Sequence, residues 1–236
     1  MSLAHKDRIS ELDSLKALAL VMMLISNFVS DLSFFKIMEV TKGDPWWYLA
    51  RATASLFVCI SGFSYYLANR ESSNFTRVFS RTKKLIFWAF IITIVTFFFQ
   101  PDAYIRFGVL HLLALASLVA FPFVKKPIIG FLFGLLLFFL PLSSEPMLVW
   151  IGLRETGFFA VDYFPLNPWL GLFFLSMASA RFIYPSGKSL SSIVWPEKWI
   201  WLGRNTLLIY VFHQPFLICI MLLTGIISFD PVSYTH

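Results

Sequence analysis

The chain has 236 residues, of which 58% are hydrophobic and only 14% are charged. A soluble domain carries about a quarter charged residues, so this composition excludes an ordinary water-solvated globular protein. The net charge of +6 would suggest nucleic acid in a soluble protein. Here the basic residues lie in short segments between apolar runs, so membrane topology explains them better and no nucleic-acid partner is expected.

Seven apolar runs follow one another along the chain, and none shows the alternation of a β-strand. A helix needs about 20 apolar residues to cross a bilayer. The runs therefore predict an all-α membrane bundle of about seven transmembrane helices, forming a single domain over residues 1–236. They cover roughly residues 14–35, 47–68, 84–100, 106–124, 127–143, 167–183 and 205–228. Pro215 lies well inside the last run and predicts a kink or a broken turn.

The distribution of Lys and Arg predicts the orientation of this bundle. With the N-terminus inside, thirteen basic residues fall in inner segments: Lys6, Arg8, Arg70, Arg77, Arg81, Lys83, Lys84, Lys125, Lys126, Arg181, Lys188, Lys198 and Arg204. Five fall outside: Lys36, Lys42, Arg51, Arg106 and Arg154. Cytoplasmic loops are enriched in Lys and Arg, so we expect a multi-pass protein of the cell membrane with its C-terminus outside. Membrane lipids are its expected partners, and the sequence leaves a homo-oligomer open.

Polar residues from several segments are expected at one depth near the outer boundary. Asn27 and Asp31 lie one helical turn apart in the first run, Arg51 begins the second, His111 begins the fourth, and Asp162 precedes the sixth. By the rise of a helix, each helical member lies within roughly 15 Å of that boundary. Asp31 and Arg51 could form a structural ion pair, and His111 could be a core histidine bonded to a carbonyl. The shared depth favours a pocket in which an acid, a base and an imidazole move protons.

A second polar stripe lies on the last run, where His213 and Gln214 directly precede Pro215. Polar helices of this kind often line a cavity in a membrane protein. The alternative is a Pro-kinked packing helix whose polar groups bond within the bundle. The basic inner loops suit lipid head groups, or else a phosphate-rich donor such as coenzyme A held by Arg204, Lys83 and Lys84. No zinc or paired-carboxylate motif occurs, so no metal is expected.

Several stretches resemble the heparan-α-glucosaminide N-acetyltransferase-like membrane proteins, including their small prokaryotic members. They are ELDSLKALALVMMLISNFVSDL (11–32), RATASLFVCISGFSYYLA (51–68), FGVLHLLALASL (107–118), DYFPLNPWLGLFFL (162–175) and LGRNTLLIYVFHQPFL (202–217). The resemblance spans nearly the whole chain. It implies a transmembrane acyltransferase fold, acetyl-CoA as the acyl donor on the cytoplasmic side, and an acceptor on the other side.

Together these features predict an acyltransferase acting on an extracytoplasmic amino or hydroxyl group of a sugar or glycolipid. His111 is the expected base, with His213 as the next candidate. Asp31 and Asp162 would orient the acceptor or the imidazole, and Asn27 and Arg51 would stabilise the oxyanion. His213 and Gln214 would line the donor channel. The competing hypothesis is a non-enzymatic transporter or binding protein, which is favoured by the lack of a histidine in the loop 33–46, where the lysosomal enzymes carry one.

Overall fold

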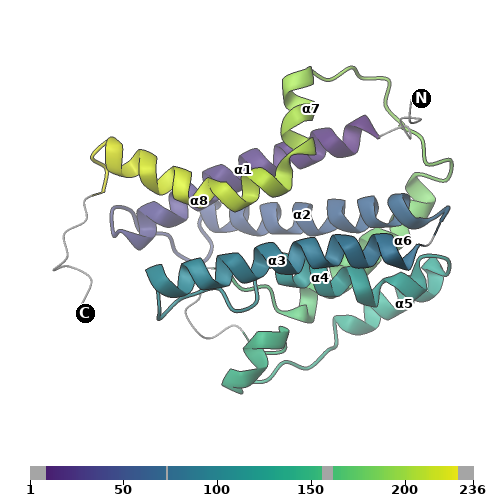
Figure 1. Ribbon diagram of the computed structural model, residues 1–236, viewed down its shortest axis with the longest axis horizontal. Coiled ribbons are helices and arrows are strands. Elements are labelled where there is room, and N and C mark those ends of the chain that lie inside the picture. The colour runs from purple at the N-terminus through teal and green to yellow at the C-terminus, as the bar shows by residue number, and fades with distance from the viewer. Residues whose placement is uncertain (1–8, 73, 156–161, 228–236) are drawn as a thin grey trace. The chain divides into compact units, whose positions relative to one another are not determined.

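The computed structural model describes residues 9–227 except 73 and 156–161. Within these ranges the chain is helical, without an extended strand, and Ser143 and Arg154 form an isolated bridge. The order (Figure 1) is α1 (Ser10–Phe34), α2 (Pro45–Asn69), α3 (Phe75–Phe99), α4 (Val109–Val119), η1 (Phe121–Phe123), α5 (Pro127–Leu137), η2 (Pro146–Ile151), α6 (Leu166–Ile183), α7 (Glu197–Arg204) and α8 (Thr206–Leu223). The expected all-α architecture is confirmed.

The described helices match the seven apolar runs, with differences at their ends. The helix expected from residue 84 begins at Phe75, because Asn74 caps it by accepting hydrogen bonds from the backbone N–H groups of Thr76 and Arg77. The fifth run extends to residue 143, whereas α5 ends at Leu137. The short helix α7 was not expected, since its mixture of charged and aromatic residues escapes a search for apolar runs. Lys6 and Arg8 lie outside the described residues.

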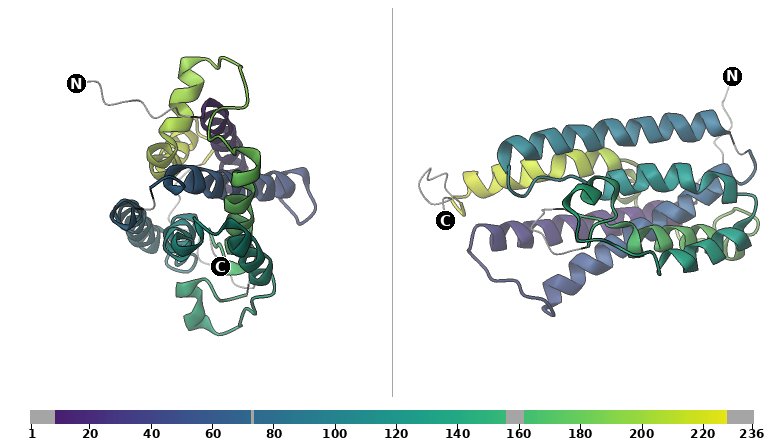
Figure 2. Two further views of the ribbon diagram at one scale, coloured as in Figure 1. Left: turned by 90° about the vertical axis from the view of Figure 1, so that its right-hand side faces the viewer. Right: turned by 90° about the horizontal axis from the view of Figure 1, so that it is seen from below.

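The chain divides into two compact units, residues 1–12 with 55–193 and residues 13–54 with 194–236. In the first unit α3 packs against α4, α5 packs against α6, and α4 also contacts α6 (Figure 2). Glycines allow close approach in this unit. A Cβ added to Gly62 of α2 would lie 2.5 Å from the backbone oxygen of Phe173 in α6. Small residues at such crossings are the usual means by which membrane helices approach each other.

The second unit contains α7, α8, the start of α2 and α1 from Asp13 onward. α7 is fastened to the start of α1 by a side-chain hydrogen bond and by a close backbone approach, among other contacts. The indole N–H of Trp199 donates to Ser14 Oγ at 2.9 Å. A Cβ at Gly203 would fall 1.8 Å from the Asp13 backbone oxygen, so this approach requires glycine. Pro215 lies inside α8, which runs on to Leu223 without a broken turn.

Much of the helical surface is apolar and uncovered. α1, α3 and α8 are long and apolar enough to cross a membrane by length and composition, while α4 and α5 are shorter apolar helices. Only 17% of the apolar window of α3 is buried, and only 11% of that of α8. The uncovered side chains on α3 include Phe87, Phe90, Phe98 and Phe99. Large exposed apolar areas are rare on monomeric soluble proteins, so these faces suit lipid.

Candidate functional site

The two polar stripes expected on the first and last apolar runs face each other within the second unit. Asn27 Nδ2 on α1 lies 2.5 Å from His213 Nε2 on α8. One turn along α1, Asp31 accepts a hydrogen bond of 2.6 Å from Gln214 Nε2. Figure 1 shows α8 lying alongside α1 in this region. The polar residues of the two stripes therefore form one polar ladder.

The order of these contacts shows that α1 and α8 run in the same direction. Gly203, just before α8, touches Asp13 near the start of α1, and His213 meets Asn27 farther along both helices. By helical rise, Asn27 lies about 21 Å beyond Asp13. The ladder is therefore deep in the apolar part of α1 and not at its charged start.

The hydrogen bonds of His213 determine which of its ring nitrogens carries the proton. Nδ1 lies 2.5 Å from the Tyr210 carbonyl oxygen, which can only accept, so Nδ1 is protonated. Asn27 Nδ2 can only donate, so Nε2 keeps its lone pair. His213 is buried at 8% exposure. The result is a neutral imidazole held in one orientation, with its basic nitrogen directed at a side-chain amide.

Asp31 does not pair with Arg51, so the ion pair considered between them is not formed. Asp31 Oδ1 bonds Gln214, and its other oxygen Oδ2 is buried without a hydrogen-bond partner among the residues described. Arg51 is exposed and its guanidinium lies 5.3 Å above the Trp47 ring. A buried carboxylate oxygen without a partner is unfavourable. Asp31 therefore retains an acceptor position that a ligand group could fill.

His111 and Asp162, in the first unit, both bond the start of α4. His111 Nδ1 accepts the Gly108 backbone N–H at 3.1 Å, and Asp162 Oδ2 accepts that of Val109 at 3.3 Å. These bonds satisfy N–H groups that a helix start leaves open. Since Nδ1 accepts, the neutral His111 ring carries its proton on Nε2. In this arrangement neither nitrogen of His111 offers a free lone pair.

The loop that carries Asp162 is held to neighbouring segments by its own hydrogen bonds. The Tyr163 hydroxyl donates to the Arg154 carbonyl at 2.8 Å and accepts the Arg154 N–H at 3.0 Å. Burial raises the pKa of Tyr163, so its phenol stays protonated and available as a donor. The Phe164 N–H donates to the Phe107 carbonyl at 3.0 Å. Asp162 is thus fixed beside α4.

The basic residues expected to hold donor phosphates have different surroundings. Arg204 Nε lies 3.5 Å from Asp13 Oδ2, and Lys16 Nζ lies 3.0 Å from Asp13 Oδ1, so the buried Asp13 carboxylate draws both cations to the start of α1. Lys83 and Lys84 are exposed on α3, and Lys83 Nζ lies 5.2 Å above the Phe79 ring. The roles predicted for these cations stay predictions.

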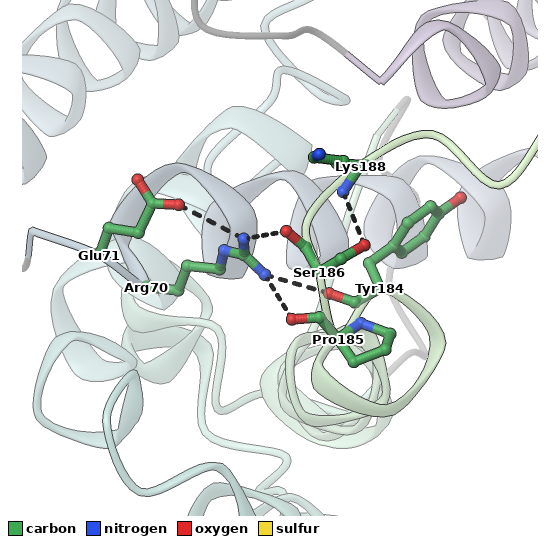
Figure 3. Close-up of polar contacts among 6 residues, drawn as sticks. All are labelled: Arg70, Glu71, Tyr184, Pro185, Ser186 and Lys188. Atoms are coloured by element: carbon green, nitrogen blue, oxygen red, sulfur yellow. Dashed lines mark hydrogen bonds and ion pairs between the residues drawn. The ribbon is translucent and has the colours of Figure 1, made fainter.

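Arg70 shows that part of the basic charge predicted on the inner side is structural. Its guanidinium donates to the carbonyl oxygens of Tyr184, Pro185 and Ser186, and contacts Glu71 at 3.3 Å (Figure 3). These carbonyls follow the C-terminal end of α6, where a cation is favourable. Gly187 has a φ of +67° and passes so close to the Arg70 guanidinium that a Cβ would overlap it. Arg70 therefore closes the α6 end.

Comparison with known families decides the assignment. The model of the family "Heparan-alpha-glucosaminide N-acetyltransferase, catalytic" matches residues 8–215. The chain belongs to this family. The resemblance read from the sequence is thus confirmed, and the apolar helices of this acetyltransferase-family protein belong in a membrane. No curated protein and no solved structure matches the chain.

Two parts of this acetyltransferase-family chain were missed by sequence reasoning. Asp13 was not singled out, although an acid in the first turn of a membrane helix, three residues before Lys16, is a recognisable signal of an ion pair. Arg81 was counted only as inner charge, although it shares a helical stripe with the buried residues Val78, Thr82 and Leu85.

Among the described residues no group of three or more His, Cys, Asp and Glu side chains could hold a metal ion.

Proposed function

We propose that this protein is a multi-pass membrane acyltransferase that moves an acetyl or acyl group from cytoplasmic acyl-CoA, in particular acetyl-CoA, to an extracytoplasmic amino or hydroxyl group of a sugar or glycolipid. Membership of the family supports the reaction class. The observation that carries the site is the pairing of Asn27 with the unprotonated Nε2 of His213 within the apolar length of α1 and α8.

The chemistry of this pair suits an acyl transfer. His213 Nε2 takes the proton that the acceptor group loses as its nitrogen or oxygen bonds the acyl carbon. The Nδ1–H bond to the Tyr210 carbonyl holds the ring and stabilises the imidazolium that results. The Asn27 amide, freed from Nε2 by the acceptor, donates to the acyl oxygen as negative charge develops there. The thioester C–S bond then breaks, and coenzyme A leaves as the thiol with the proton returned from the His213 imidazolium. Asp31, held by Gln214, offers its open oxygen Oδ2 to another N–H or O–H of the acceptor.

The shared direction of α1 and α8 supports the proposed topology. Two parallel crossing helices must be separated by an odd number of crossings. If α2, α3, α4, α5 and α6 each cross once, five crossings separate α1 from α8, and α8 is the seventh. With the N-terminus inside, the C-terminus is then outside. On this arrangement the ladder lies nearer the outer surface than the Asp13 end of α1, as an extracytoplasmic acceptor requires.

The proposal is tested with the purified full chain in nanodiscs, supplied with [acetyl-¹⁴C]acetyl-CoA and glucosamine. We expect label to appear in the sugar and free coenzyme A to be released in equal amount. Omitting the sugar should leave only slow hydrolysis. The contrary result is saturable sugar binding or uptake with no acetyl transfer from any acyl-CoA offered. That outcome would establish the non-enzymatic alternative, which the open oxygen of Asp31 would also serve.

A further inference from the structure

Arg81 lies inside the first unit, at the seventh position of α3 and about 9 Å along the helix from Phe75. Tyr65 on α2 is fully buried, donates to the Ser117 carbonyl at 2.6 Å, and is close enough to Arg81 for the two to interact electrostatically. Arg77 donates to the Ala68 carbonyl one turn nearer the loop. The Arg77 bond joins the facing ends of the two helices, and Arg81 lies one turn farther along α3.

No anionic side chain is available to Arg81 from the helices around it. α2, α3, α4 and α6 contain neither Asp nor Glu in their whole lengths. Arg81 makes no hydrogen bond or ion pair with any residue of the described ranges. It is half-buried, unlike Lys83 and Lys84, which are exposed farther along the same turn. A half-buried guanidinium without a counter-charge is unfavourable, so a bound anion would stabilise it.

Unpartnered hydroxyl groups lie at the same level. Thr82 is 1% exposed and its Oγ1 has no hydrogen-bond partner among the described residues, and the same holds for the buried Oγ of Ser64. Thr82 directly follows Arg81 in α3, and Ser64 directly precedes Tyr65 in α2. Two hydroxyl donors thus accompany the guanidinium. Nearer the loop, Asn69 Oδ1 is also buried and unpartnered, which suits an O–H or N–H of the same ligand.

We infer that Arg81, with the Thr82 and Ser64 hydroxyls, forms a binding site for a phosphate ester anion at the loop-side ends of α2 and α3. A guanidinium offers two parallel N–H donors to the oxygens of a phosphate, and hydroxyl groups complete the remaining acceptor positions. The anion supplies the charge that the four helices lack. A soluble phosphate ester and an anionic lipid head group share this chemistry. The site stands on the surroundings of Arg81 and does not depend on acyl transfer.

The test measures binding of two probes to the full chain, coenzyme A in solution and phosphatidylglycerol in nanodiscs otherwise made of phosphatidylcholine. Ligand-induced stabilisation against heat reports binding to the folded state. We expect Arg81→Gln to weaken binding of at least one probe by about tenfold or more, since a charge-assisted hydrogen bond is lost. Lys125→Gln is the matched control, because it removes the same charge from an exposed position on the same predicted side of the membrane.

Each pattern of results decides the question. Loss of coenzyme A binding alone identifies a soluble phosphate ester as ligand, loss of the lipid effect alone identifies a head group, and loss of both shows a site open to either. Equal losses in Arg81→Gln and Lys125→Gln, or no loss in either, overturn the proposal. If Arg81→Gln does not fold, Thr82→Val and Arg81→Lys replace it. The first removes a hydroxyl and the second the paired donors, and unchanged affinity in both would equally refute the site.

Discussion

At the scale of single residues, the hydrogen bonds of His111 and His213 distinguish the roles of these two histidines. His111 accepts a backbone N–H at the start of α4, whereas His213 accepts a side-chain amide that a substrate can displace. Both are histidines in apolar segments, and sequence alone ranked His111 first because it shares a depth with acidic and basic residues. The tautomer of each ring, fixed by its partners, reverses that ranking in the proposed mechanism.

Replacing His213 by alanine should reduce acetyl transfer by about 10² or more, because the proton acceptor is lost. His111→Ala should chiefly lower thermal stability, by the roughly 1 kcal/mol typical of a lost helix cap, and leave turnover within a few fold. Turnover and unfolding temperature are measured on both variants. A large loss of turnover in His111→Ala with full activity in His213→Ala would restore His111 as the base.

Asn27→Ala should lower kcat by about 10² while the protein remains folded, since one donor to the developing oxyanion disappears. The KM for the acceptor should change less than kcat, because the bond is made mainly in the transition state. Asn205→Ala is a suitable control, as that exposed amide donates only to the Trp201 carbonyl in its own segment. Equal kinetics for the two variants would remove Asn27 from the site.

At the scale of helices, single residues decide local features: a glycine allows two helices to approach closely, and a cap determines where a helix begins. α2 approaches α6 at Gly62, α7 approaches α1 at Gly203, and α3 starts where Asn74 caps it. The apolar runs predicted that helices exist, but these local features decide where they begin and how closely they pack. Because membrane helices gain little from the hydrophobic effect among themselves, such close packing contributes much of their association.

Gly62→Ala should destabilise the first unit by about 1–3 kcal/mol, because the added Cβ meets a backbone oxygen that cannot move aside easily. Gly130→Ala should be milder, since its Cβ would lie 3.1 Å from the mobile end of Met177. Unfolding in detergent measures both. A smaller effect at Gly62 than at Gly130 would show that α2 and α6 have room to separate.

At the scale of the whole molecule, composition and charge bias act through the membrane and not through pairwise contacts. The uncovered apolar faces of α3 and α8 need lipid, and the basic residues favour the cytoplasmic side. The parallel contacts of α1 and α8 favour an odd number of crossings between them, and the charge bias favours an inside N-terminus, so the two arguments together give the proposed topology.

A reporter fused after residue 236 should therefore be active outside the cell, and one inserted between residues 70 and 75 should be active inside. Alkaline phosphatase and green fluorescent protein, which respond to opposite sides, give complementary readouts at each position. The reverse pattern at both positions would place Asn27 and His213 toward the cytoplasm and contradict an extracytoplasmic acceptor. The same pattern at both positions would imply an even number of crossings.

The sequence by itself determined that this protein is helical, that it belongs in a membrane and that it is a member of the acetyltransferase family. These properties depend on composition, on local periodicity and on short motifs, all of which can be recognised in the sequence without knowing which segments lie together in space. It also named Asn27, Asp31, His213 and Gln214. Only the tertiary structure joined Asn27 to His213 across 186 positions and gave His111 a backbone hydrogen-bond partner. It also showed that Arg81 has no ion pair with a described residue. Such facts depend on which helix faces meet, and that is set by packing across the chain.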